Sequence, residues 1–578
     1  MIYTCKWNTD KNSLPLQDDF KLQFKAQNQD DIPLILIDDN DNKQSVIYSY
    51  PKNAIHLSSL VDWINDFQPK KNEVIELVQV TGTSFKIRIG SRESNDAEGI
   101  YLGKLKDSYA QYTSHRNFIL PTEDLVTHTF ICGATGSGKT VLGKAIVEEL
   151  ALKEIPAIIV DLKGDLSSLG LMAPQYTPET IGSWINTEPS KKEALCQQKV
   201  NEINTGLDEF GLTSEKVKTY IDSLSVAVFT PKAGKGIHLS ISSPLAAPKD
   251  IASLMLSDRS EVLEMIGSYT DSFIRSLFAE RKIGRLDKYK TFLHEIVQYC
   301  WEHSISLNGK EGLVTVQQMI NEPPFREIGG MNLNKFIDDK MRVELANRIA
   351  MCLTGVEQLW FEGIPINIPM LLSRPTEHGD KTPVSIVNVS DLPFDEQMYV
   401  VSHLAYSIYN WARPQGDSGE KPRILFFIDE IGGGGGKQAF YPSHPYNPPS
   451  KPPLNVLLKK GRTFGISCLF ATQNPGDIDY KGLSNCGTWF VGRLQTERDR
   501  RKIMEGISTA EIQIQNIKNK IEDLSFKEFL VKTKDGKVNF VKERWLVTYH
   551  KTLSENDLST INGPEIKKHF QECAKITS

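Results

Sequence analysis

The chain has 578 residues, of which 40% are hydrophobic and 24% are charged, and its net charge at pH 7 is −5. This length is enough for several domains, and the composition is ordinary for a globular protein, neither cysteine-rich nor poor in aromatic residues. The small negative charge excludes a globally basic nucleic-acid coat, although it leaves room for a local basic channel.

The eight cysteines are scattered and form neither a CxxC pair nor the spacing of a metal site. Scattered thiols fit a reducing cytosol and argue against a structural zinc site. No apolar run approaches the roughly 18 residues that a membrane-spanning helix needs. Residues 1–10 lack the apolar core of a signal peptide. We therefore expect a cytoplasmic protein, unless a partner carries it to a membrane.

Residues 1–112 are expected to form a β-rich domain. Short segments rich in branched and aromatic residues, such as 33–37, 46–48 and 74–80, are separated by turn-prone clusters. This pattern favours a small barrel or sandwich. An irregular α+β cap is the alternative.

An apolar run, a glycine-rich turn and the start of a helix follow one another from residue 130. The residues of the turn are Gly133, Ala134, Thr135, Gly136, Ser137, Gly138, Lys139 and Thr140. This is the context of a phosphate-binding P-loop, in which backbone N–H groups and a helix N-terminus surround the β-phosphate. We expect Lys139 to reach the β- and γ-phosphates and the Thr140 hydroxyl to bind Mg²⁺. Together with Val141, these residues form the expected site for a nucleoside triphosphate.

Further apolar runs alternate with helical patterns along the rest of the chain. The runs lie at 157–161, 384–389, 424–428 and 466–471, with a shorter one at 489–492. Such alternation predicts an α/β fold with a parallel sheet covered on both faces. Ligands then bind at the carboxyl ends of the strands, where polar residues follow several of these runs.

Residues 171–378 are dominated by helical patterns, for instance at 251–277, with one strand expected at 226–229. We interpret this segment as a large, mainly helical insertion into the nucleotide-binding core. The expected domains are 1–112 (β-rich), 113–170 (first part of the core), 171–378 (insertion), 379–545 (second part of the core) and 546–578 (a C-terminal arm).

Asp429 and Glu430 directly follow the apolar run 424–428. We expect their strand to lie beside the P-loop strand. Asp429 would then hold Mg²⁺ through its water shell, and Glu430 would polarise the water that attacks the γ-phosphate. The alternative is a pair of surface acids that ends a strand.

Two further strand ends carry polar residues. Gln473 ends the run 466–471 and is placed to contact the γ-phosphate and the attacking water, unless it is a capping or loop residue. Asp161 ends the strand after the P-loop helix. It is expected either to order the Mg²⁺ shell or Lys163, or to form a loop ion pair.

Two arginines are candidates for a finger that stabilises charge on the γ-phosphate of a neighbouring subunit. They are Arg462, in a glycine-flanked loop, and Arg493, with Arg462 favoured. The alternative for each is a surface cation. Basic clusters at 459–460 and 498–502 do not interleave with aromatic residues, so no base-stacking platform is indicated.

Taken in order, these motifs resemble the HerA/FtsK superfamily of RecA-like ring ATPases, above all its HerA-like branch. The resemblance rests on the P-loop, on Asp161-Leu162-Lys163-Gly164-Asp165, on Asp429-Glu430 and on the block from Ser450 to Thr496. It covers residues 115–170 and 380–505 specifically, and the remainder only loosely.

The resemblance implies a RecA-like core that binds ATP and Mg²⁺, and a homohexameric ring that threads double-stranded DNA. It implies work with a nuclease or another effector, in DNA end processing or in defence against phage. It also implies an N-terminal β-barrel, a C-terminal arm that braces a neighbour, and Arg462 as the finger acting in trans.

One departure is that many HerA-type proteins continue the acidic pair with Ala-His, whereas Ile431 and five glycines, 432–436, follow here. The glycines predict a mobile loop that either lines a pore or forms a surface excursion. The leading hypothesis is a DNA motor. The alternatives are a hexameric scaffold that gates an effector, favoured by the lack of a clear basic stripe, and a coupling ATPase for secretion, which would need a membrane partner.

Overall fold

A computed structural model of the chain divides into two compact units. The first comprises residues 1–120, 528–531 and 537–544, and the second comprises 121–527, 532–536 and 545–578. The structure describes residues 2–6, 13–15, 31–37, 43–49, 52–56, 74–81, 83–89, 99–106, 113–232, 236–241, 244–278, 283–434, 438–507, 521–553 and 555–577.

The first unit contains a seven-stranded sheet in the order β1-β6-β7-β3-β4-β5-β2. In β3 (Asp31–Ile37), buried and exposed residues alternate, because successive side chains of a strand point to opposite faces. Ile32, Leu34 and Leu36 are the buried ones. The β-rich character expected for the N-terminal part is confirmed. The other strands are β1 (Ile2–Lys6), β2 (Ser13–Pro15), β4 (Lys43–Ser49), β5 (Ala54–His56), β6 (Val74–Thr81) and β7 (Ser84–Ile89).

Strands from the two ends of the chain also meet in the first unit. β22 (Val538–Glu543) pairs antiparallel with β8 (Gly99–Lys106), and β8 is followed in the sheet by β9 (Thr113–Pro121). β21 (Glu528–Lys532) lies on the other side of β22. This pairing joins residues more than 400 positions apart, which no local sequence pattern indicates.

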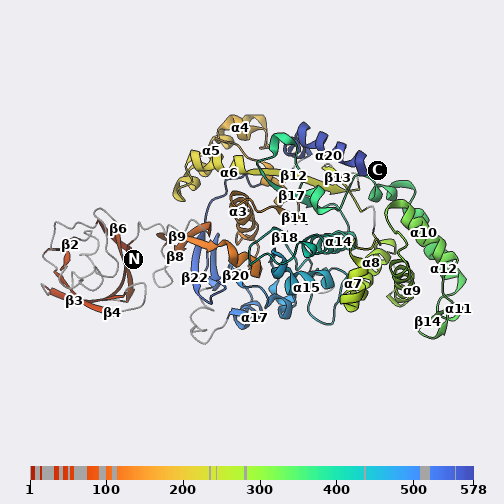
Figure 1. The fold of residues 1–578 in the computed structure, drawn as a ribbon. Coiled ribbons are helices and arrows are strands. Elements are labelled where there is room, and N and C mark those ends of the chain that lie inside the picture. The colour runs from red at the N-terminus through yellow and green to blue at the C-terminus, as the bar shows by residue number, and fades with distance from the viewer. Residues whose placement is uncertain are drawn as a thin grey trace. The chain divides into compact units, whose positions relative to one another are not determined.

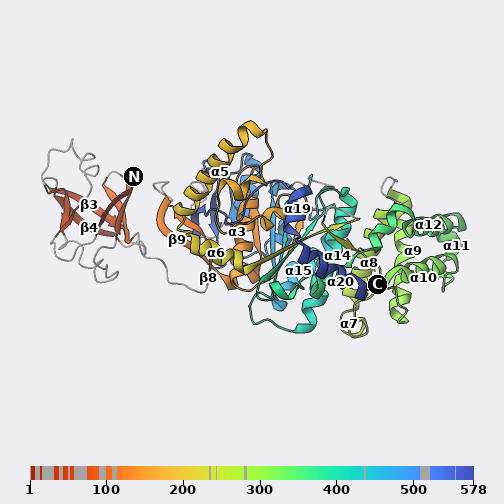
Figure 2. The same ribbon diagram turned by 90° about the horizontal axis from the view of Figure 1, so that it is seen from above.

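The core of the second unit is a parallel sheet in the order β16-β13-β12-β17-β11-β18-β19-β10-β20. Its central strands are buried along their whole length, as expected for a parallel sheet with helices on both faces (Figures 1 and 2). The predicted α/β fold is confirmed. The strands are β10 (Thr129–Cys132), β11 (Ala157–Asp161), β12 (Leu224–Pro231), β13 (Ile237–Ser240), β16 (Ile364–Pro365), β17 (Thr382–Asn388), β18 (Ile424–Ile428), β19 (Ile466–Thr472) and β20 (Thr488–Val491).

The order of these strands corrects one expectation. The strand that ends before Asp429, β18, does not lie beside the P-loop strand β10, because β19 lies between them. The expectation was wrong because crossover helices let the chain skip strand positions, and no local pattern records the skip. The carboxyl ends of all three strands still meet at one edge of the sheet.

Helices α3 (Lys139–Leu152) and α14 (Phe394–Ala412) pack on the central strands. The helix expected at 251–277 is divided into α7 (Ile251–Ser257) and α8 (Arg259–Leu277), because the Asp258 side chain caps the start of α8. The other helices longer than one turn include α5 (Pro189–Glu209), α6 (Ser214–Ser223), α9 (Ile283–Glu302), α10 (Gly309–Asn321), α12 (Asp339–Cys352), α15 (Lys451–Lys460), α17 (Glu497–Ile507), α19 (Glu555–Ile561) and α20 (Pro564–Thr577).

The segment 171–378 contributes both helices and strands. Helices α9, α10 and α12 gather at one end of the second unit, away from α3 (Figures 1 and 2). Three strands of the same segment, β12, β13 and β16, extend the central sheet beyond β17, whereas the sequence indicated only one. Within the described part of the chain, no helix combines the length and the apolar character needed to cross a bilayer.

Candidate nucleotide-hydrolysis site

The phosphate-binding loop joins β10 to α3 at the carboxyl edge of the sheet. Gly136 and Gly138 have φ angles of +76° and +101°, which side chains with a Cβ rarely adopt. Backbone bonds hold the loop to the two neighbouring strand ends: Gly133 N donates to Thr472 O at 3.3 Å, and Ala134 N donates to Arg493 O at 2.7 Å. The loop is therefore shaped before any phosphate enters it.

Lys139 lies inside this loop. Its Nζ donates to the carbonyl oxygens of Gly133 and Ala134, at 2.8 and 2.9 Å. Burial lowers the pKa of the Lys139 ammonium, and the nearby carboxylates of Asp429 and Glu430 oppose this shift. The Lys139 ammonium thus lies within the loop that would surround the phosphates of a bound nucleotide.

Thr140 and Asp429 come together as the sequence predicted. Thr140 Oγ1 donates to Asp429 Oδ2 at 2.7 Å. Burial raises the pKa of the Asp429 carboxyl, and the bond from Thr140 partly offsets this effect. A hydroxyl and a carboxylate side by side are the hard oxygen ligands that Mg²⁺ prefers. The Ser137 Oγ of the same loop is buried without a partner in the described residues. The residues present therefore fit a nucleotide with Mg²⁺.

Every oxygen of the Glu430 carboxylate has a polar contact. Oε2 is paired with Lys163 Nζ at 3.0 Å, while Oε1 accepts from Gln473 N at 3.0 Å and from Thr472 Oγ1 at 3.3 Å. The φ of Glu430 is +66°, an uncommon value for a residue with a side chain. The backbone turns sharply here, and the carboxylate is linked to the phosphate loop through Gln473, which bonds both Glu430 and Thr135.

Gln473 links the end of β19 to the phosphate loop. Its Oε1 accepts from the Thr135 hydroxyl at 2.7 Å, while its backbone N–H bonds Glu430. One residue thus contacts both the loop and the candidate base. Because β19 lies between β10 and β18, Gln473 occupies the position between them.

Asp161 orders Lys163, one of the roles that the sequence suggested, because its Oδ1 accepts from the Lys163 backbone N–H at 3.3 Å. Its carboxylate accepts from Gly164 N at 2.7 Å and from both the N–H and the hydroxyl of Ser167, at 2.8 and 2.6 Å. It therefore shapes the turn after β11. That turn presents Lys163 to Glu430.

The two candidate arginines lie at opposite ends of the parallel strands, Arg493 at the carboxyl ends and Arg462 at the amino ends. Arg493 follows β20, at the same edge as the phosphate loop, and its side chain is exposed. Arg462 precedes β19, a strand of seven residues, so it lies about 20 Å from the Gln473 end of that strand. Its guanidinium is paired with the exposed carboxylate of Glu420. Arg462 is therefore too far away to serve the phosphate loop of its own chain.

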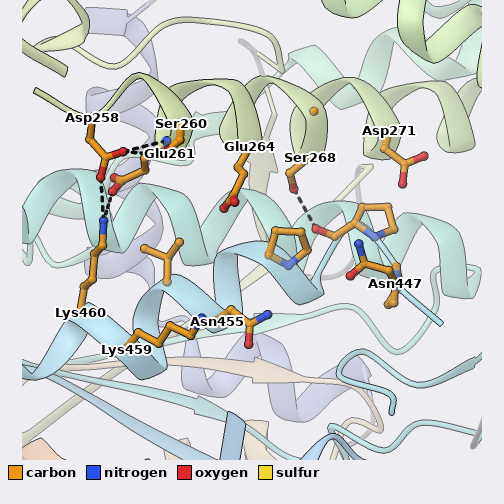
Figure 3. Close-up of a pocket in the computed structure, with 15 residues that line it drawn as sticks. Asp258, Ser260, Glu261, Glu264, Ser268, Asp271, Asn447, Asn455, Lys459 and Lys460 are labelled. Carbon is orange, nitrogen blue, oxygen red and sulfur yellow. Dashed lines mark hydrogen bonds and ion pairs between the residues drawn. The ribbon is translucent and has the colours of Figure 1, made fainter. Parts of the chain in front are cut away.

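One lysine of the basic cluster 459–460, Lys460, is paired with two acids, whereas Lys459 is exposed. Figure 3 shows Lys460 reaching Asp258 and Glu261 across a hollow between α8 and α15. The hollow has a volume of about 570 Å³, and Glu264 and Asp271 of α8 also line it. This acidic lining does not suit a phosphate backbone.

Two backbone hydrogen bonds form within the described part of the glycine-rich loop after Glu430. Gly433 N donates to Glu430 O, and Gly434 N donates to Gln438 O. A Cβ added to Gly433 would lie 2.0 Å from Gln438 O, so this tight turn requires glycine there. Residues 435–437 lie outside the described part of the chain.

One contact of α3 with the C-terminal part of the chain could not be predicted from the sequence. Glu148, on the buried side of α3, accepts from the backbone N–H of Val547 at 3.2 Å and of Thr548 at 2.8 Å. A strap of residues 545–550 is thereby fixed to the helix that begins at the phosphate loop. Because about 400 residues separate the partners, no spacing in the sequence could have indicated this contact.

Comparison with known proteins gives one family match. The model of the family described as "Helicase HerA, central domain" matches residues 100–408, and no curated protein matches the chain. Among solved structures, VirB4 of Thermoanaerobacter pseudethanolicus is 12% identical, with 79% of this chain and 99% of that one covered and a TM-score of 0.44. The plasmid coupling protein TrwB, in complex with a non-hydrolysable ATP analogue, is 10% identical, with 80% and 92% covered and a TM-score of 0.43.

Proposed function

This chain belongs to the family of the HerA helicase central domain, and on this premise we propose that it is an ATP-hydrolysing motor that moves along or remodels double-stranded DNA. It is a P-loop ATPase of that family. The observation that carries the proposal is the bond between Thr140 and Asp429, with Glu430 and Gln473 at the same edge of the sheet. Residues from the ends of two strands, β18 and β19, thus converge on one phosphate loop.

Each of these side chains has a distinct role in the proposed reaction. Thr140 and Asp429 would hold Mg²⁺, which neutralises charge on the β- and γ-phosphates. Lys139 exchanges its bonds to the loop carbonyls for bonds to phosphate oxygens. Glu430 accepts a proton from the attacking water, and Gln473 orients that water while remaining in contact with the phosphate loop.

The motor is proposed to work as a homohexamer in the cytoplasm. Arg462, which lies at the end of β19 opposite the site of its own chain, would complete the site of a neighbour, with Arg493 as the second candidate. A nuclease or another effector is the proposed partner, in DNA end processing or in defence against phage. These assignments rest on the family and on the placement of the two arginines.

A second candidate function is a hexameric scaffold that gates an effector with little DNA translocation. The observation in its favour is that Lys460, one of the two lysines of this cluster, is paired with Asp258 and Glu261 of its own chain. Such a scaffold would retain the complete hydrolysis site.

The test is steady-state ATP hydrolysis with and without linear double-stranded DNA at moderate salt, with Glu430→Gln as the blank. Turnover that rises several-fold with DNA would support the motor. Turnover that does not respond to DNA would favour the scaffold. Because DNA contacts are electrostatic, the stimulation should weaken as salt is raised.

A further inference from the structure

A second cavity lies at the start of α3. It has a volume of about 230 Å³, and its lining includes Val141, the residue directly after Thr140. None of the residues that contact Glu430 lines it, so it lies away from the hydrolytic end of the phosphate loop. A nucleotide with its γ-phosphate beside Glu430 must place its base at the other end.

Most residues that line this cavity are apolar or aromatic, and the charged side chains of Lys199, Glu202 and Lys527 line it as well. Val141 packs with Leu546 in one buried cluster that forms the floor. The rings of Phe526, Trp545 and Tyr549 line the sides. The volume is below the roughly 300 to 1,000 Å³ of pockets that enclose a drug-sized ligand, so the cavity suits a single flat ring system.

These three rings differ in how closely their faces are covered. Trp545 has the Lys527 ammonium 4.0 Å from its ring centroid, and Tyr549 packs on Trp184 with their centroids 5.4 Å apart. Phe526 is 60% exposed, the Lys527 ammonium lies farther from its ring, 5.5 Å from the centroid, and within the described residues no other ring packs on it. An exposed aromatic ring at the mouth of an apolar cavity is a stacking surface for a base.

The cavity is tied to the phosphate loop by the backbone. Lys527 N donates to Ser137 O at 3.2 Å, so the residue next to Phe526 is bonded to the loop itself. The opposite wall is held by Glu148, which accepts from the backbone of the strap 545–550. One wall is therefore bonded to the phosphate loop and the other to the helix that begins there, as a site for the base of the same nucleotide requires.

We propose that this cavity binds the base of the nucleotide, with the Phe526 ring stacking on a purine that rests on Val141 and Leu546. This proposal rests on the proposed ATP hydrolysis and names the part of the site that recognises the base. The larger hollow of Figure 3 is unsuited to this role, because its lining carboxylates would repel a polyanionic nucleotide.

The test compares two ligands by calorimetry on the full chain, ADP and inorganic tripolyphosphate. Phe526→Ala should weaken ADP binding by about 5- to 150-fold, the range for loss of one base–aromatic stack. Tripolyphosphate has no base, so its affinity should not change. Phe526→Trp, which keeps a ring, should retain ADP affinity.

The matched control is Leu256→Ala in α7, which removes another exposed apolar side chain (92% exposed) outside the cavity. It should change neither affinity. The inference is overturned if Phe526→Ala leaves ADP binding intact, or if it weakens ADP and tripolyphosphate equally, because the effect would then come through the phosphate loop. A wild-type chain that bound neither ligand would instead overturn the proposed hydrolysis, and this inference with it.

Discussion

The two ends of β19 differ in what surrounds them. At the carboxyl end, Gln473 forms hydrogen bonds with Thr135 of the phosphate loop and with Glu430. At the other end, Arg462 is 49% exposed and paired with Glu420, which is itself 56% exposed. An exposed ion pair contributes little to stability, so Arg462 can leave its partner at small cost.

This difference indicates which parts of the hydrolysis site one chain forms by itself and which part a neighbouring subunit would supply. The Gln473 end is preorganised within a single chain, whereas the Arg462 end is available to another subunit. If this comparison is right, changes at the two ends should affect turnover in different ways. The predictions below run from the largest expected effect to the smallest.

Arg462→Ala should lower ATP turnover by about 10³-fold or more, the range for loss of an arginine finger, and leave nucleotide binding nearly intact. Steady-state hydrolysis and ADP calorimetry measure the two effects. The control is Arg501→Ala in α17, which removes another exposed arginine from an exposed ion pair. Wild-type turnover in Arg462→Ala would show that the finger assignment is wrong.

Co-expression of two inactive variants tests whether Arg462 acts on the site of a neighbouring subunit. Chains carrying Lys139→Ala and chains carrying Arg462→Ala should each be inactive, since one lacks the phosphate-binding ammonium and the other the finger. Co-expressed, they should recover part of the activity, because some interfaces would join an intact loop to an intact arginine. If no activity were recovered, Arg462 would act within its own chain. That result would contradict the inference from its distance to the phosphate loop along β19.

Glu430→Gln should lower turnover by about 10²- to 10⁴-fold, because the amide cannot accept the proton of the attacking water. ATP binding should persist, since Lys139, Thr140 and Asp429 are unchanged. Quenched-flow measurement of bound ATP and of released phosphate separates the two steps. Normal phosphate release by this variant would exclude Glu430 as the base.

Gln473→Ala should lower turnover by about 10²-fold, the usual cost of losing one preorganised polar contact at a reacting centre. Its bond to Thr135 would also be lost. Asn474→Ala is the matched control, because Asn474 is the next residue and its side chain is exposed. Equal losses in the two variants would point to a disturbed loop rather than to the Gln473 amide.

Lys163→Ala should have the smallest effect, a change in turnover of about fivefold or less, because Lys163 is 45% exposed and solvent screens its ion pair with Glu430. ADP affinity should not change. Lys163→Arg should restore the wild-type rate if the pair orients the Glu430 carboxylate. A loss as large as that of Glu430→Gln would mean that Lys163 contacts the phosphates directly.

Local sequence patterns were sufficient to predict those site residues that directly follow a strand. The glycine-rich turn before Lys139, and Asp429-Glu430 directly after an apolar run, carry their chemistry in consecutive residues. The same applies to the α/β class, since apolar runs alternating with helices leave few other arrangements. The bond between Thr140 and Asp429 follows, because parallel strands bring their carboxyl ends to one edge.

The sequence by itself determined the phosphate loop, the acidic pair and the parallel sheet, because each depends on residues that are neighbours in the chain. Only the tertiary structure decided that β19 separates β10 from β18, that Lys163 faces Glu430 and that Phe526 and Leu546 border Val141. The contacts of Lys163 with Glu430 and of Val141 with Phe526 and Leu546 join residues 267 to roughly 400 positions apart. Their geometry is set by crossover connections and by packing between layers, which leave no periodic mark in the sequence.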